Sequence, residues 1–267
     1  MSGRYLPYAH YKPSPVPWQG MLPSHWASKP LKHLCHFHGG GTPSKDNKGY
    51  WSGDIPWVSP KDMKRKFIDS TEDHITAQAV ENSSTKLIDV RALLIVVRSG
   101  ILQHSIPVAI NTKKVTLNQD MKALIFGKHM AVEYAHYFVE GNQADLLLNW
   151  SKQGATVESI EQEYLANAIW PTPPIDEQRS IANFLDHETA KIDTLIDKQQ
   201  QLIKLLKEKR QAVISHAVTK GLDPDVPMKD SGVEWLGEVP EHWVVRRLKH
   251  AAKLQSGLPK GKDLTGC

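Results

Sequence analysis

Disulfides, membrane spans and secretion signals are the first features that this sequence lacks. Only two of its 267 residues are cysteine, Cys35 and Cys267, so a disulfide framework is excluded. No apolar run approaches the roughly 20 residues that a helix needs to cross a bilayer, and the first residues lack the apolar segment of a signal peptide. We therefore expect a cytoplasmic protein without a structural disulfide and without membrane association.

Catalytic signatures are missing as well. The glycines at 39–41 are followed by Thr-Pro-Ser-Lys, which differs from the Gly-Lys-Ser/Thr ending of a phosphate-binding loop. There is no Asn-Pro-Pro-Tyr or Asp-Pro-Pro-Tyr methyltransferase motif, no dinucleotide fingerprint and no serine-nucleophile elbow. His33, Cys35, His36 and His38 have ligand chemistry, but their spacing matches no usual zinc pattern. The sequence thus predicts a chain that is not an enzyme and holds no metal.

Charge is present in modest excess and is unevenly distributed. The net charge is +4, and hydrophobic residues make up 40% of the chain, which is compatible with a folded core. Within residues 29–66, eight lysine and arginine residues face only three aspartates. A local basic surface of this kind suits a polyanion, although a solvated lysine-rich surface would give the same pattern.

The longest regular pattern covers residues 175–218, which contain no proline or glycine. Apolar residues recur there in steps of three and four, which predicts an amphipathic helix roughly 60 Å long. Such a stripe indicates pairing with another helix, while a helix lying across its own domain is the alternative. Thr189 could cap a second helix and split the element. The predicted stripe consists of Ile181, Leu185, Ile192, Leu195, Leu202, Leu206 and Val213.

The residues before this helix predict an α+β domain with short strands and long loops. Apolar, β-branched runs at 92–98, 107–110 and 121–126 are typical of buried strands, and residues 131–139 and 143–150 have helical spacing. Four prolines near the N-terminus indicate an extended leader. We divide the chain into a leader (1–17), a globular domain (18–170), a coiled-coil-like helical spacer (171–222) and a final segment (223–267).

An internal repeat explains the final segment. The run Trp-Gln-Gly-Met-Leu-Pro-Ser-His-Trp at 18–26 returns as Trp-Leu-Gly-Glu-Val-Pro-Glu-His-Trp at 235–243, and Leu-Lys-His at 31–33 returns at 248–250. Both pairs share an offset of 217 residues without a gap. A unit consisting of a globular domain and a long helix therefore begins again, and we expect residues 223–267 to be a linker and the truncated start of a second domain.

Several short motifs occur together in a fixed order. They are Gly-Gly-Thr-Pro-Ser at 40–44, Ile-Pro-Trp-Val at 55–58, Arg-Ser-Gly-Ile at 98–101, Asn-Gln-Asp-Met-Lys-Ala-Leu at 118–124, Gln-Gly-Ala-Thr-Val at 153–157, the run at 165–178 and the repeated tryptophan motif. As a set they resemble the specificity subunit of type I restriction–modification enzymes, from about Trp18 onward. The resemblance implies a target recognition domain, a conserved helical spacer and the start of a second recognition domain.

The same resemblance implies partners and cofactors. In that family each recognition domain reads one half of a bipartite sequence in double-stranded DNA, while separate modification subunits bind S-adenosylmethionine and methylate adenine. No cofactor is then expected on this chain, with S-adenosylmethionine, ATP and Mg on the modification and restriction subunits. A non-DNA protein-interaction module, or an enzyme fragment completed by a partner, are the alternatives.

Hydrogen-bonding, basic and aromatic side chains on the predicted loops are the candidates for DNA contacts. They are Thr42, Ser44, Lys45, Tyr50, Trp51, Trp57, Lys61, Lys64, Arg98, Ser99, Gln103, Asn118, Gln119, Lys122, Gln153 and Thr156. The sequence does not separate base contacts from phosphate contacts, and Trp51 and Trp57, taken singly, fit loop anchors better than DNA contacts. Because no second long helix follows, we predict a homodimer through the apolar stripe, reading a symmetric, interrupted site.

Overall fold

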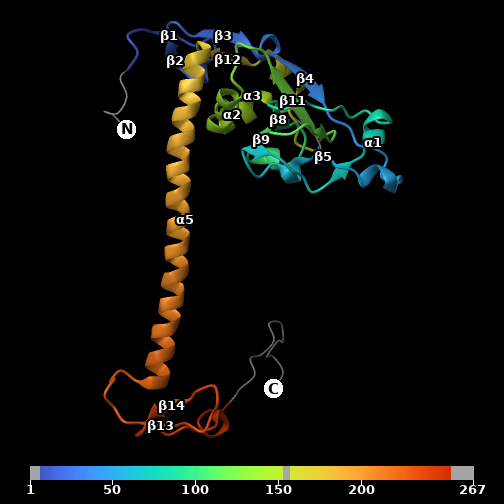
Figure 1. Cartoon of the computed structure of the whole chain (residues 1–267). Coiled ribbons are helices and arrows are strands. Elements are labelled where there is room, and N and C mark those ends of the chain that lie inside the picture. The colour runs from blue at the N-terminus through green and yellow to red at the C-terminus, as the bar shows by residue number, and fades with distance from the viewer. Residues whose placement is uncertain (1–6, 153–156, 254–267) are drawn as a thin grey trace, which may run out of the picture. The chain divides into compact units, whose positions relative to one another are not determined.

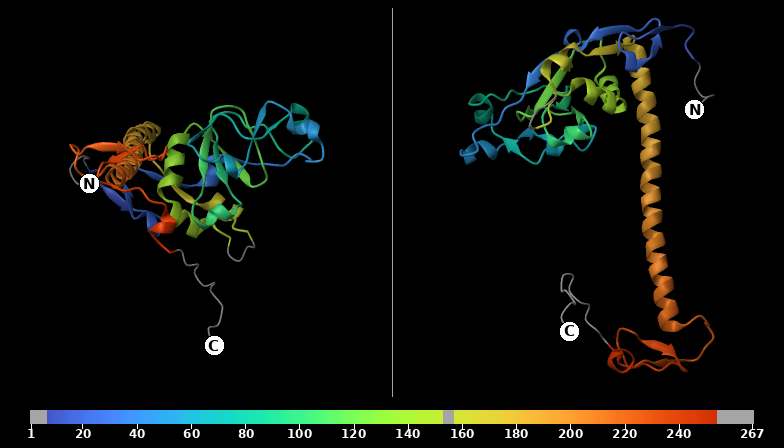
Figure 2. Two further views of the ribbon diagram at one scale, coloured as in Figure 1. Left: turned by 90° about the horizontal axis from the view of Figure 1, so that it is seen from below. Right: turned by 180° about the vertical axis from the view of Figure 1, so that it is seen from behind.

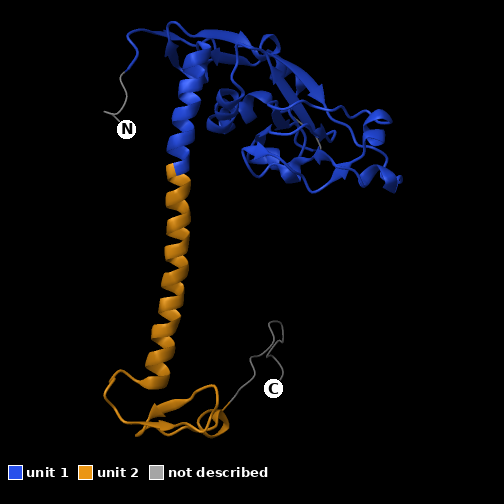
Figure 3. Cartoon of the chain, viewed as in Figure 1, with its two compact units in different colours: residues 1–190 blue, residues 191–267 orange. Residues whose placement is uncertain are grey.

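The computed structural model describes residues 7–152 and 157–253. The chain forms two compact units, residues 1–190 and residues 191–267 (Figures 1 and 3). We call the first of these the front unit. The helix α5 belongs to both, because it crosses the boundary between them.

The front unit combines short strands with short helices. Its strands are β1 (Tyr11–Pro13), β2 (Met21–Pro23), β3 (Ala27–Pro30), β4 (Cys35–Gly39), β5 (Ile55–Val58), β6 (Phe67–Ile68), β7 (His74–Ile75), β8 (Leu93–Val96), β9 (Val108–Asn111), β10 (Thr116–Leu117), β11 (Met121–Phe126) and β12 (Ile169–Thr172). Its α-helices are α1 (Ala77–Glu81), α2 (Val132–Gly141), α3 (Gln143–Trp150), α4 (Gln162–Asn167) and the start of α5 (Ile175–Lys220). Single turns of 3₁₀-helix lie at η1 (Pro17–Gln19), η2 (Leu31–His33), η3 (Lys48–Trp51), η4 (Pro60–Asp62) and η5 (Gly100–Gln103).

A five-stranded sheet forms the centre of the front unit, in the order β4-β11-β8-β9-β6. Its pairs are antiparallel except for β6 with β9, which are parallel. All four residues of β8 are buried, as expected of a continuous apolar run, and α2 packs against β8 and β9. The predicted strands at 92–98, 107–110 and 121–126 are confirmed as β8, β9 and β11, and the predicted helices as α2 and α3.

A smaller core lies beside the main one. Strands β10, β5 and β7 form a three-stranded sheet, and Trp57, Ile75 and Ala79 make an apolar cluster against which Tyr50 and Trp51 pack. Strand β5 thus carries Trp57 into the small core and Val58 into the main one.

The N-terminal residues 1–17, predicted to be an extended leader, include a strand of the front unit. Its residues Tyr11–Pro13 form β1, which pairs antiparallel with β2. The chain can return because Gly20 has a φ of 65°, which favours glycine, and the Ser14 amide donates to the Gly20 carbonyl at 2.8 Å. The tripeptide runs of β1 and β2 therefore make a hairpin at the edge of the front unit.

The second unit repeats this hairpin at the offset seen in the sequence. Strand β13 (Met228–Asp230) pairs antiparallel with β14 (Glu238–Pro240) in the register of β1 with β2, shifted by 217 residues. Gly237 has a φ of 64°, and the Ser231 amide donates to its carbonyl at 3.0 Å. The turn η6 (Leu248–His250) likewise matches η2. The sequence repeat is thus a repeat of backbone structure.

The helix α5 is one uninterrupted element of 46 residues (Figure 2). The Thr189 hydroxyl donates to the carbonyl of Leu185, four residues earlier, at 2.8 Å. It therefore caps no new helix, and the alternative of two shorter helices is wrong. Gly221, with a φ of 82°, follows its last residue, as in many helix ends. Among the described helices, none is both long and apolar enough to cross a membrane.

The beginning of α5 is part of the front unit, which differs from the predicted spacer of residues 171–222. Gln178 and Ala182 are buried, and Ile181 packs against the main core. These contacts explain why the compact unit extends to residue 190.

Candidate nucleic-acid interface

The glycine loop after β4 packs tightly against the chain between β10 and β11. The Gly41 amide donates to the Leu117 carbonyl at 2.8 Å, and the Asn118 amide donates to the Val58 carbonyl at 2.9 Å. A Cβ atom on Gly40 would lie 1.9 Å from the Asn118 carbonyl oxygen. The glycines therefore permit close backbone packing.

The loop after β8 reaches the same place. The amides of Val97 and Arg98 donate to the Asp120 carbonyl at 2.8 and 3.2 Å, and the Ser99 amide donates to the Glu158 carbonyl at 3.1 Å. Three loops that are far apart in the sequence are thereby joined. We call the surface that they form, residues 40–45, 97–103 and 117–122, the recognition face.

Most predicted residues of these loops present their side chains. Ser44, Lys45, Arg98, Gln103 and Gln119 are exposed. Together they offer hydroxyl, amide, guanidinium and ammonium groups, which are the groups that contact phosphates and base edges.

Three further predicted residues of the recognition face are half-buried: Thr42, Ser99 and Lys122. The Thr42 hydroxyl bonds the Gln119 amide oxygen, linking two of the loops. Lys122 lies opposite Gly39 in the β4–β11 pair. Burial lowers the pKa of Lys122 from its ordinary value, because a buried ammonium loses hydration.

The prediction that Trp57 and Asn118 contact DNA is wrong for this structure, because both side chains are buried. Only 6% of each residue is exposed. The Trp57 indole donates to the Gly41 carbonyl at 3.0 Å, and the Asn118 amide oxygen accepts from the Asp120 amide at 3.0 Å. Both side chains hold the recognition face from within, so neither is available to DNA in this structure.

Tyr50 and Trp51 are half-buried and pack against the small core. The Trp51 indole donates to the Ser44 carbonyl at 3.1 Å, and its ring meets the Trp57 ring edge-on at 5.0 Å between centroids. They anchor the loop that presents Ser44 and Lys45.

The part of the predicted basic surface around Lys61 and Lys64 is neutralised by acidic side chains. Lys61 lies 2.9 Å from Asp73 and 3.0 Å from Glu72, and Lys64 lies 4.0 Å from Glu72. Side-chain hydrogen bonds to Asp73 and Glu72 raise the pKa of Lys61 above its ordinary range. The acids follow residue 66, so a charge count that ended there missed them. As exposed pairs they contribute little stability, but they reduce the local positive charge.

Gln153 and Thr156 lie outside the described residues. The described flanks come together, because the Lys152 amide donates to the Ser159 carbonyl at 2.8 Å. The role of these two residues in DNA contact stays a prediction, as it does for the exposed residues above.

The predicted apolar stripe of α5 divides into two parts. Ile181 and Leu185 are half-buried, and Ile181 packs against the main core. Ile192, Leu195, Leu202, Leu206 and Val213 are 48 to 58% exposed. Sequence reasoning missed three further exposed residues, Ile196, Ile203 and Ile214, which lie on the same helical face because they are seven and eleven residues apart.

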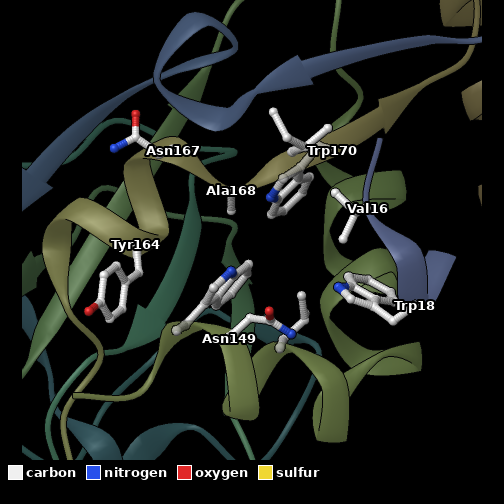
Figure 4. Close-up of a pocket in the computed structure, with 10 residues that line it drawn as sticks. Val16, Trp18, Asn149, Tyr164, Asn167, Ala168 and Trp170 are labelled. Atoms are coloured by element: carbon white, nitrogen blue, oxygen red, sulfur yellow. The ribbon is translucent and has the colours of Figure 1, made fainter. Parts of the chain in front are cut away.

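A cavity of about 290 Å³ lies between η1, α3, α4 and β12 (Figure 4). Trp18, Trp150, Tyr164 and Trp170 line it, and the Trp150 and Trp170 rings stack at 6.3 Å with 5° between planes. None of the predicted site residues lines it. Trp18, from the repeated motif, also lies 6.2 Å from the Phe138 ring, so the cavity marks where the first hairpin docks.

An α+β unit with converging polar loops, followed by a long helix, is the architecture that the motifs led us to expect of a DNA specificity subunit. The family described as type I restriction modification DNA specificity domain matches residues 23–205. The chain belongs to this family.

Its relatives carry the corresponding names. The EcoR124I/EcoR124II specificity subunit of Escherichia coli is 38% identical over 208 residues, which cover 78% of this chain and 46% of the relative. The MjaIX specificity subunit of Methanocaldococcus jannaschii is 29% identical over 246 residues, covering 89% of this chain and 54% of the relative. The chain thus spans about half the length of the curated relatives that it matches.

Solved structures show the same fold. A chain from a study of complex assembly and conformational transition of a type I restriction–modification system superposes with a TM-score of 0.62 at 20% identity, covering 75% of this chain and 47% of that one. The HsdS subunit of Thermoanaerobacter tengcongensis superposes with a TM-score of 0.55 at 19% identity, covering 75% and 46%.

Proposed function

We propose that this chain is the DNA-recognition component of a type I restriction–modification system and reads one half of a bipartite target with its recognition face. The observation that carries this proposal is the convergence of the family motifs at 40–44, 98–101 and 118–122 on one surface, where Lys45, Arg98 and Gln119 are exposed. Amide and guanidinium groups can read base edges in the major groove, and an ammonium group can neutralise a phosphate.

The chemistry would belong to the partners. Modification subunits would bind S-adenosylmethionine and methylate adenine, and a restriction subunit would use ATP and Mg. This chain would place those subunits on DNA without binding these cofactors itself. The missing methyltransferase and nucleotide-binding motifs support this division.

We further propose a homodimer through α5. A stripe of large apolar side chains that are about half exposed is more stable when it is covered, and the same stripe on a second copy is self-complementary about a two-fold axis.

Reconstitution with the cognate modification subunits, followed by mapping of methylated adenines, tests the function. We expect methylation of a symmetric sequence with an unspecified gap. Absence of site-specific methylation from an assembled complex would contradict the proposal. Salt titration of DNA binding distinguishes a protein-interaction module, because phosphate contacts make log affinity fall with log salt whereas an apolar protein interface responds little.

A further inference from the structure

The first turn of α5 is fixed to the N-terminal hairpin. The Glu177 carboxylate accepts hydrogen bonds from His25 Nε2 at 2.9 Å and from Trp26 Nε1 at 3.0 Å. The Tyr8 hydroxyl donates to it as well. This carboxylate is largely covered, with 20% of the side chain exposed. The start of the helix therefore has a defined seat.

The next residue ties α5 to the loop before α2. Gln178 is fully buried; its amide oxygen accepts from the Ala131 amide at 2.8 Å, and its amide nitrogen donates to the His129 carbonyl at 3.0 Å and the Pro173 carbonyl at 2.8 Å. A buried carboxamide with every bond satisfied holds its position closely.

A further polar attachment lies at Asp186, nine residues along the helix from Glu177. Asp186 accepts a hydrogen bond of 2.7 Å from the Tyr137 hydroxyl on α2 and one from the ammonium of Lys66, beside β6. The Lys66 ammonium also lies over the Tyr137 ring, 4.2 Å from its centroid, and only 19% of the Lys66 side chain is exposed. We call Lys66, Tyr137 and Asp186 the Asp186 clamp.

Because α5 is a rigid helix, contacts at two points along it, near Glu177 and at Asp186, fix its direction as well as its position. Nine residues correspond to about 13 Å along the helix axis. Glu177, Gln178 and the buried Ala182 hold the first two turns of α5. The Asp186 clamp adds a polar attachment about one turn further on, which opposes a pivot of the helix about those first turns. Lys66 was predicted to belong to the basic surface of residues 29–66, but its ammonium group contacts Asp186 on α5.

We propose that the Asp186 clamp is a positioning site that sets the direction of α5 against the recognition domain and thereby the spacing between the two half-sites that a dimer reads. This inference rests on the proposed function. The 34 residues from Asp186 to Lys220 extend about 51 Å, so a tilt of about 4° at the clamp moves the far end by roughly 3.5 Å, the rise of one base pair. A small change in the angle of α5 at the clamp would therefore change the distance between the two half-sites by a whole base pair.

The test uses the complex with modification subunits and a DNA library in which the half-sites are separated by gaps of different length. The wild-type chain should methylate one gap length strongly. Asp186→Asn and Lys66→Met should lower the ratio of methylation at that gap to methylation one base pair away by about fivefold, equivalent to about 1 kcal/mol, with the half-site sequence unchanged. Lys66→Arg should restore the wild-type ratio, since a guanidinium can meet both Asp186 and the Tyr137 ring. Asp197→Asn, at an exposed acid on the same helix, is the matched control.

A second measurement is independent of DNA. Spin labels at Lys113→Cys and Gln200→Cys, in a Cys267→Ser background and diluted with unlabelled chain, report the distribution of distances between the front unit and the helix. Cys35 stays unlabelled, because its thiol is buried and burial raises its pKa to about 12. Asp186→Asn should broaden the distribution and Asp197→Asn should not.

An unchanged gap preference or an unchanged distance distribution in folded Asp186→Asn protein would overturn the clamp. Absence of methylation by the wild-type complex would instead refute the proposed function, and the spin-label result would still decide the clamp.

Discussion

The indole nitrogen of Trp57 lies 3.0 Å from the carbonyl oxygen of Gly41 and donates a hydrogen bond to it. This bond joins the small core to the glycine loop, while Thr85 donates to the neighbouring Leu117 carbonyl at 3.0 Å. The recognition face is therefore supported from beneath by buried groups, and its conformation depends on residues that do not reach the surface.

Gly40→Ala tests this support. The new Cβ would meet the Asn118 carbonyl oxygen at 1.9 Å, so the two loops must separate, at a cost of about 1–3 kcal/mol. We expect a lower midpoint in urea unfolding and a loss of sequence preference in DNA binding. Gly39→Ala is the matched control, because nothing lies within 4 Å of its Cβ position. Equal effects of the two substitutions would contradict this account.

Lys45 and Lys61 should differ as phosphate contacts. Lys45 is exposed, and no ion pair joins it to another side chain in the described part of the chain. Lys45→Ala should weaken binding to all sequences alike and reduce the salt slope by about 1. Lys61→Ala should change the slope less, because Glu72 and Asp73 already neutralise Lys61. A larger change for Lys61 would show that its ion pairs open on DNA; salt titrations with one duplex measure both.

Gln119 should act on sequence preference. Its side chain is exposed and is oriented by the Thr42 hydroxyl. Gln119→Ala should reduce discrimination at one base position by about 1–3 kcal/mol, while binding to random DNA stays close to wild type. Competition between cognate and substituted duplexes measures this, and equal loss on both would refute a base contact.

The apolar stripe predicts a change of oligomeric state. Leu195→Lys combined with Leu202→Lys places two charges on the proposed dimer contact and should give monomers at tens of micromolar, with the front unit still folded. Gln201→Lys is the control, because Gln201 is exposed and lies about 160° from the centre of the stripe at 100° per residue. Sedimentation measures the three proteins, and a monomeric wild-type chain would exclude the dimer.

Acid should destabilise the front unit through His136. Its ring is almost fully buried, and burial, followed by the charge of Lys66, lowers its pKa from 6.5 to about 4. The unfolded chain therefore binds a proton that the folded chain does not. Stability is complete above pH 6.5 and falls toward pH 4, by about 1.5 kcal/mol between pH 6.5 and 5. His136→Gln should remove this part of the slope in urea unfolding, whatever its effect at pH 7; an unaltered slope would contradict the assignment.

Local sequence patterns were sufficient to predict the main strands and helices. The run of Leu-Leu-Ile-Val in β8 is apolar on both faces and folds as the central strand, and the three-and-four spacing of α5 gives one long helix. The repeated tryptophan motif also indicated the second hairpin, because residues of equal chemistry at equal spacing fold alike.

Those patterns could not predict which side chains contact each other across long sequence distances. Lys66 and Asp186 are 120 residues apart, and no property of either residue indicates the other. The burial of Trp57 depends on β7 and α1, which supply the other side of the small core. For the same reason the charge of Lys61 looked unbalanced until the turn that carries Asp73 was placed beside it.

The two hairpins have a consequence for how such a chain can change. Gly20 and Gly237 adopt the same conformation in the same register, so the 217 residues from one to the other begin and end at equivalent joints. The loops of the recognition face lie within that stretch and take no part in the turn hydrogen bonds of either hairpin, which join Ser14 to Gly20 and Ser231 to Gly237. We therefore expect that substitutions in these loops leave both hairpins unchanged, so that the surface of the domain can alter while its two ends keep the same backbone structure.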